Sequence, residues 1–126
     1  VITKTVGAEG QMSWGQLREM VAAGMSVQSH SVSHPDLTGV SDERLQSELT
    51  ASRTATAGVT GEPGYVFCYP AGAYNDRVVA AVRAAGYVMA VATADGAPLG
   101  PESLYTITRT RIQPFLPVDT FARLVD

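Results

Sequence analysis

The sequence lacks three features that would each define a class of protein. It has a single cysteine, Cys68, so no disulfide within the chain can stabilise it. Its 9 basic residues are fewer than its 12 acidic residues and form no cluster, which excludes an electrostatic surface for nucleic acid or anionic lipid. The longest apolar stretch, residues 78–94, contains Arg83 and Gly86 and is too interrupted to cross a bilayer. We expect neither a nucleic-acid partner nor a membrane span.

Size and composition predict one folded domain. The chain has 126 residues, of which 45% are hydrophobic and 17% are charged, so a long disordered protein is excluded. A chain of this length can bury roughly two-thirds of its unfolded surface, so a core can form without disulfides. No internal repeat or low-complexity segment is visible. We therefore treat residues 1–126 as a single domain.

Helices and strands are predicted to alternate along the chain. Capping residues, apolar periodicity and glycine stops predict helices over 13–23, 41–58 and 75–85, and a short one from 119. Alternating or apolar runs predict strands over 25–29, 65–69, 87–91 and 106–112, with residues 1–2 as the stub of another. This order indicates a parallel sheet with helices outside it, either an open α/β sheet or a barrel. Function in such folds lies at the carboxyl ends of the strands.

The histidines of the chain, His30 and His34, lie where the first predicted strand meets its following loop. Their spacing lets the two rings converge if the loop winds into about one helical turn, which Pro35 then ends. Neutral imidazoles are ordinary zinc ligands, and three protein ligands plus a water make a catalytic site. Taken alone, the spacing fits a metal-binding pair and a pair of solvated loop histidines equally well.

A second group of interest follows the next strand, in the segment Phe67-Cys-Tyr-Pro-Ala-Gly72. Proline and glycine on a strand-to-helix turn can aim backbone N–H groups at one point, as an oxyanion site requires. By itself, an ordinary turn is the simpler interpretation of this segment. The two segments together are more informative than either one.

Two segments carry a family resemblance: His30-Ser-Val-Ser-His34-Pro and the later turn aromatic-x-Tyr69-Pro-x-Gly72-x-Tyr-Asn. Together they resemble the second and third motifs of the NodB-type polysaccharide deacetylases, carbohydrate esterase family four. The segments 14–24, 34–37, 86–91 and 108–112 also resemble parts of that family. The resemblance implies an α/β fold, a distorted (β/α) barrel, here incomplete at the N-terminus. It also implies metal-dependent hydrolysis of an N-acetyl, or sometimes O-acetyl, group on a carbohydrate such as peptidoglycan or a chitin-like glycan. Members of the family mostly act outside the cell or in the cell envelope.

The same resemblance implies roles for individual residues. His30 and His34 match the two metal-binding histidines, with zinc as the usual ion and another divalent ion as the alternative. Ala71 matches the position whose backbone amide contacts the oxyanion, although the family usually has tyrosine there. The turn residues that would contact the substrate are Tyr69, Pro70 and Gly72.

Cys68 stands where many family members have an arginine that orients the catalytic aspartate. In a branch that lacks this arginine, one on a later strand substitutes, and Arg109 is the candidate here. A plain surface arginine explains Arg109 equally well. For Cys68 itself we expect a reduced, buried residue that behaves as a small apolar side chain.

The family mechanism also needs residues that this sequence does not contain. Two aspartates, one a base and one the third metal ligand, come from a Thr-Phe-Asp-Asp-Gly type motif, and no adjacent Asp-Asp occurs here. The histidine of a late Leu-x-His motif is also missing. Asp95 is one candidate for the general acid, but it fits an Asp-Gly turn better, and Asp36, Asp76 and Asp119 fit loop or helix-cap positions. Because the family order places the Asp-Asp motif before Val1, we expect an N-terminally truncated domain that is inactive by itself.

Two alternatives to an active enzyme follow from these missing residues. Two imidazoles without a carboxylate hold zinc less tightly, so the ion can be absent from this chain. A missing first strand would also leave a sheet edge that invites self-association. The chain could therefore be a degenerate, non-catalytic carbohydrate-binding module, or a barrel fragment that pairs with another copy.

Overall fold

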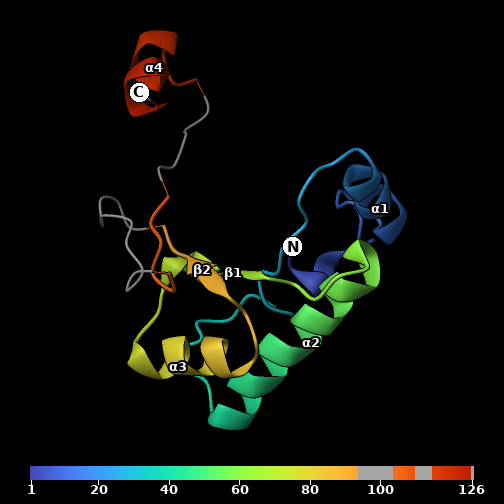
Figure 1. Cartoon of the computed structure of the whole chain (residues 1–126), viewed down its shortest axis with the longest axis vertical. Helices are drawn as coiled ribbons and strands as arrows, with labels where there is room; N and C mark the ends of the chain where they lie inside the picture. Colours follow the sequence, from blue (N-terminus) through green and yellow to red (C-terminus); the bar gives the residue numbers. More distant parts are fainter. Residues whose placement is uncertain (94–103, 110–114, 126) are drawn as a thin grey trace.

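The computed structural model describes residues 1–93, 104–109 and 115–125. Its elements are the 3-10 turn η1 (Thr3–Thr5), the helix α1 (Trp14–Ala22), the helix α2 (Asp42–Thr60), the strand β1 (Val66–Cys68), the 3-10 turn η2 (Pro70–Gly72), the helix α3 (Asp76–Ala84), the strand β2 (Met89–Val91) and the helix α4 (Val118–Val125). In Figure 1, α2 and α3 lie on one side of the strands, α1 packs at the end of α2, and α4 lies apart from the other helices. None of the helices in the described ranges combines the length and apolarity needed to cross a bilayer.

The strands form an open parallel sheet. β1 pairs with β2, with Phe67 opposite Ala90. Single parallel bridges extend the sheet on both sides, from Ser29 to β1 and from β2 to Ile107. At the outer side of Ser29, the Val1 amino group donates to the Gln28 carbonyl, and the His30 N–H donates to the Val1 carbonyl at 2.9 Å. This is the mixed α/β arrangement that the sequence predicts, but the described residues do not close into a barrel.

The helices begin where the sequence predicts, because their caps are local. Ser13 and Gln16 form both hydrogen bonds of a capping box before α1, and Ser41 accepts from the Arg44 N–H before α2. The predicted end of α2 at Gly58 is wrong, since the helix continues to Thr60 and is stopped by Gly61 at φ +75°. Val59 packs with Leu17 and Val27 in a small buried cluster, and this burial offsets the cost of a glycine within the helix.

Within the described residues, the predicted strands pair over fewer residues than expected, and two of them form only single bridges. Over 25–29 only Ser29 makes a bridge, because the side-chain oxygen of Gln28, in place of a backbone carbonyl, accepts the Val66 N–H at 3.0 Å. Over 106–112 only Ile107 makes a bridge, and residues 110–112 lie outside the described residues. The expected strands 65–69 and 87–91 are confirmed as β1 and β2.

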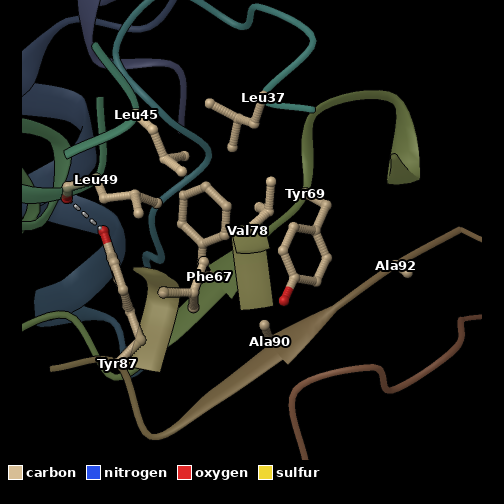
Figure 2. Close-up of a cluster of buried hydrophobic side chains, with 10 residues drawn as sticks. Leu37, Leu45, Leu49, Phe67, Tyr69, Val78, Tyr87, Ala90 and Ala92 are labelled. Atoms are coloured by element: carbon tan, nitrogen blue, oxygen red, sulfur yellow. Dashed lines mark hydrogen bonds between the residues drawn. The ribbon is translucent and has the colours of Figure 1, made fainter. Parts of the chain in front are cut away.

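The main core lies between the sheet and the helices α2 and α3 (Figure 2). Its ten buried members are Leu37, Leu45, Leu49, Phe67, Tyr69, Val78, Val82, Tyr87, Ala90 and Ala92. The Phe67 ring lies 5.6 Å from that of Tyr69 and 5.1 Å from that of Tyr87, measured between centroids. The Tyr87 hydroxyl donates to the Leu49 carbonyl at 3.0 Å, which satisfies its polar end inside the core. This packing fixes β1 and therefore the loops at its carboxyl end.

Candidate functional site

The two histidine rings converge at the carboxyl end of the sheet. Their centroids lie 4.7 Å apart with an angle of 80° between the ring planes. The backbone that joins them, which we call the histidine loop (residues 30–34), is not the helical turn that the spacing suggested. Ser31 and His34 adopt left-handed conformations, with φ of +63° and +57°. The loop therefore reverses direction through two left-handed residues. These residues, and not a helical turn, bring the two rings together.

A hydrogen bond to a carbonyl at the end of β1 fixes which ring nitrogen of His30 carries the proton. Its Nδ1 lies 2.7 Å from the Cys68 carbonyl oxygen, which can only accept, so Nδ1 carries the proton and the Nε2 lone pair is free. Burial lowers the pKa of His30, the Cys68 carbonyl partly offsets this, and the nearby positive groups, including Arg109, lower it further. The ring is therefore neutral at neutral pH, as a metal ligand must be.

The strained histidine loop is held by side-chain acceptors. Ser31 Oγ accepts the His34 N–H at 2.9 Å, and Glu48 Oε2 accepts the N–H groups of Val32 and Ser33, both at 2.9 Å. Left-handed conformations at residues with a side chain persist only where such contacts overdetermine them. No role for Glu48 was predicted from the sequence. The pattern that could have indicated Glu48 is its spacing of three residues from Leu45, which places an acidic side chain on the apolar face of α2.

The turn after β1, which we call the proline turn (residues 69–73), presents an unused backbone donor. Ala71 and Gly72 have φ of +53° and +74°, and the N–H groups of Gly72 and Ala73 donate back to Tyr69 and Pro70. No hydrogen bond among the described residues uses the Ala71 N–H, and Ala71 is exposed. Tyr69 and Pro70 are buried, so the turn rests on the core. The Ala71 amide is therefore available to an anionic oxygen.

Arg109 reaches the side chain of Cys68. Its Nη2 donates toward Cys68 Sγ at 3.2 Å, and its Nε donates to the Ala92 carbonyl at 3.3 Å. Cys68 is half-buried, which corrects the expectation of a fully buried side chain. Burial raises the pKa of the Cys68 thiol although Arg109 opposes this, so the thiol stays protonated at neutral pH. The guanidinium of Arg109 thus lies beside position 68, where the family resemblance calls for an arginine.

Of the acidic residues that the sequence placed in loops or caps, Asp36 lies in a loop, whereas Asp76 and Asp119 lie inside helices. Asp36 accepts the Thr38 N–H at 2.9 Å in a local turn, and Asp76 and Asp119 lie in the first turns of α3 and α4. Asp95 lies outside the described residues. Within the described ranges, no three histidine, cysteine or acidic side chains come close enough to hold a metal ion. The histidine pair therefore has no third ligand in that part of the chain.

The profile of the polysaccharide deacetylase family matches residues 1–90. The chain belongs to the polysaccharide deacetylase family. This confirms the family resemblance drawn from the histidine loop and the proline turn.

Similar proteins are themselves described as members of this family. A Bacillus subtilis protein, YxkH, provisionally named a polysaccharide deacetylase, is 28% identical over 126 residues, which are 100% of this chain and 45% of that protein. The crystal structure of a polysaccharide deacetylase from Bacillus cereus is 31% identical with a TM-score of 0.89, over 99% of this chain and 40% of that one. The deacetylase PplD from Streptococcus pyogenes, solved in complex with acetate, is 27% identical with a TM-score of 0.92, over 100% of this chain and 57% of that one. The chain spans less than half the length of the curated relatives that it matches.

Proposed function

We propose that the protein is a metal-dependent deacetylase that removes N-acetyl, or O-acetyl, groups from a carbohydrate polymer such as peptidoglycan or a chitin-like glycan. The observation that carries this proposal is the convergence of two imidazoles beside a turn whose Ala71 amide has no acceptor among the described residues. Family membership and the likeness to deacetylase structures support it. The distorted (β/α) barrel and a location outside the cell or in the cell envelope belong to the same proposal.

The residues present fit a zinc ion in part. His30 is neutral, its Nδ1–H is held by the Cys68 carbonyl, and its Nε2 lone pair is free, which is the usual arrangement of a metal-binding histidine. The His34 ring lies next to it. The pair supplies two ligands, and we infer that the third is a carboxylate from outside the described residues. When bound, zinc supplies Lewis-acid activation of water near neutral pH.

The other residues of the site act on the substrate and on the missing carboxylate. The Ala71 N–H is proposed to donate to the acetyl oxygen as negative charge develops on it, a contribution that needs the backbone and not a particular side chain. Arg109 is proposed to orient the catalytic carboxylate, since a guanidinium binds a carboxylate with two parallel hydrogen bonds. Tyr69, Pro70 and Gly72 are proposed to shape the substrate side of the proline turn.

The test is acetate release by the protein as its gene encodes it. The purified protein is loaded with zinc and incubated with acetylated chito-oligosaccharides or peptidoglycan fragments. The variants His30→Ala and His34→Ala are expected to lose activity by roughly a hundredfold or more, because each removes a metal ligand. Arg18→Ala, an exposed position on α1, is the control and is expected to retain activity.

Three outcomes separate the candidate functions. Zinc-dependent release that both histidine variants abolish supports the deacetylase. Sugar binding without turnover, unchanged in the two histidine variants, would instead indicate a non-catalytic carbohydrate-binding module. No metal-dependent release from any acetylated sugar would overturn the proposal.

A further inference from the structure

A buried carboxylate lies directly behind the histidine loop and takes no part in the proposed reaction. Glu48, on α2, is 6% exposed. Its Oε2 accepts the N–H groups of Val32 and Ser33, and its Oε1 accepts the Ser33 hydroxyl. Arg44, one helical turn earlier, lies 3.6 Å from Oε1. The contacts of this carboxylate with the histidine loop therefore fall on Val32 and Ser33, two of the three residues between the histidines.

This carboxylate is the side-chain acceptor for the path between the two histidines, while the N–H groups of Thr3 and Lys4 donate to the Ser31 and Val32 carbonyls at 3.2 and 2.9 Å. Val32 and Ser33 lie between the left-handed residues Ser31 and His34, and their N–H groups share one acceptor oxygen. Glu48 supplies that acceptor from a different element, 15 to 16 residues away in sequence. Charge-assisted hydrogen bonds of this kind are about twice as strong as neutral ones. α2 is in turn anchored in the core by Leu45 and Leu49.

The ionisation of Glu48 is consistent with this geometry. Burial favours the neutral form, but the Ser33 hydroxyl, the two backbone N–H groups and Arg44 together lower the pKa of Glu48 below its usual value. Glu48 is thus a carboxylate at neutral pH, able to accept every one of these bonds.

We propose that Glu48 is a positioning residue that sets the separation of the two histidine rings, so that zinc affinity depends on it although it touches neither ring. The inference rests on the proposed function, because it takes zinc as the ion that the rings share. The polar partners of a metal ligand typically change metal affinity by about 10–100-fold when they are removed. Glu48 acts one step further away, through the backbone that joins the ligands.

The experiment measures zinc affinity by competition with a chelator, in the protein as its gene encodes it. Glu48→Gln keeps the shape of the side chain but removes its charge, and it is expected to weaken zinc binding at least about tenfold. Amide hydrogen exchange over residues 31–34 is expected to quicken in the same variant without zinc. Ser33→Ala, which removes the hydroxyl contacts with Glu48 and Arg44 but keeps both backbone contacts with Glu48, is expected to show a smaller shift in the same direction.

Two control variants separate positioning from charge and from general stability. Glu43→Gln makes the same charge change at an exposed position of α2 and should leave zinc affinity within twofold. Val82→Ala destabilises the core on α3 without touching the histidine loop, and it should also leave zinc affinity within twofold. A double variant, Ser33→Ala with Glu48→Gln, should lose less affinity than the sum of the two single losses, because both remove the same contact.

The outcomes distinguish this inference from the proposed function. If the wild-type protein binds zinc and Glu48→Gln binds it equally well, the positioning role is overturned and the deacetylase proposal stands. If the wild-type protein binds no zinc, the positioning inference is overturned, while the deacetylase proposal is decided separately by metal-dependent acetate release. If Glu48→Gln does not fold, Ser33→Ala decides, and an affinity equal to wild type contradicts the inference.

Discussion

At the scale of single residues, the site depends on backbone conformations that most side chains disfavour. Four residues other than glycine have positive φ in the described ranges, and three of them, Ser31, His34 and Ala71, lie in the histidine loop or the proline turn. Such conformations cost of order 1–3 kcal/mol each and cluster at functional sites. The residue types alone do not reveal them, since serine, histidine and alanine are ordinary loop residues.

Gly72 lies in the proline turn at a position with no room for a side chain. A Cβ at this position would lie 2.0 Å from Thr93 Oγ1 and 2.9 Å from the Thr93 backbone nitrogen, and φ is +74°. Gly72→Ala is therefore expected to lower the free energy of unfolding by about 3 kcal/mol or more, from left-handed strain plus steric overlap. Urea denaturation measures this loss.

Gly24 provides the matched control for Gly72. Its φ is +85°, but nothing lies within 4 Å of the position of an added Cβ. Gly24→Ala should therefore cost only the left-handed strain, about 1–2 kcal/mol. Equal losses in the two variants would contradict the steric part of the argument.

At the scale of elements, the helix caps were predictable because they need only neighbouring residues. The sequence predicts a helix over 75–85 and assigns Asp76 to a loop or helix-cap position. In the structure the cap is Asn75, whose Oδ1 accepts the Val78 N–H at 3.0 Å, and Asp76 lies in the first turn. The strands were harder to bound, because a ladder ends where a partner from another segment stops pairing, as Gln28 shows with its side-chain bond to Val66.

The cap of α3 carries a prediction at this scale. Asn75→Ala removes the acceptor for the Val78 N–H and is expected to destabilise the protein by about 1 kcal/mol. Asn75→Asp keeps an acceptor at the same position and should stay within a few tenths of a kcal/mol of wild type. Thermal or urea unfolding of the three proteins tests this, and an alanine variant as stable as wild type would be contrary to a capping role.

At the scale of the whole molecule, α2 joins two separate hydrophobic clusters. Leu49 packs in the main core, and Val59 packs in the small cluster with Leu17 and Val27. The two positions are ten residues apart on one helix, a distance of about 15 Å at 1.5 Å per residue. α2 is also the element that carries Glu48 to the histidine loop, so both clusters support the site.

The separation of the two clusters predicts additive effects. Leu49→Ala is expected to cost about 2–5 kcal/mol and Val59→Ala less, since fewer buried methyl groups are lost. The double variant should lose the sum of the two within about 0.5 kcal/mol, because no contact is shared. A coupling well above 1 kcal/mol, measured by denaturant unfolding of all four proteins, would show that the clusters act as one.

Part of the whole-molecule interpretation stays a prediction. The sequence suggested self-association through an uncovered sheet edge. In the described residues, one edge pairs residues 1–4 with residues 28–32, and the other ends at the bridge of Ile107. The barrel also stays a proposal, because the described strands form an open sheet.

The sequence by itself determined the helix starts, the alternation of helices and strands, and the family, because these rest on capping, periodicity and motifs within short segments. The tertiary structure alone decided how the site is assembled. The Cys68 carbonyl holds His30, Glu48 holds the histidine loop and Arg109 meets Cys68, through contacts between residues 15 to 41 positions apart. Contacts at that separation form only after the sheet and α2 share a core, and local sequence patterns do not encode them.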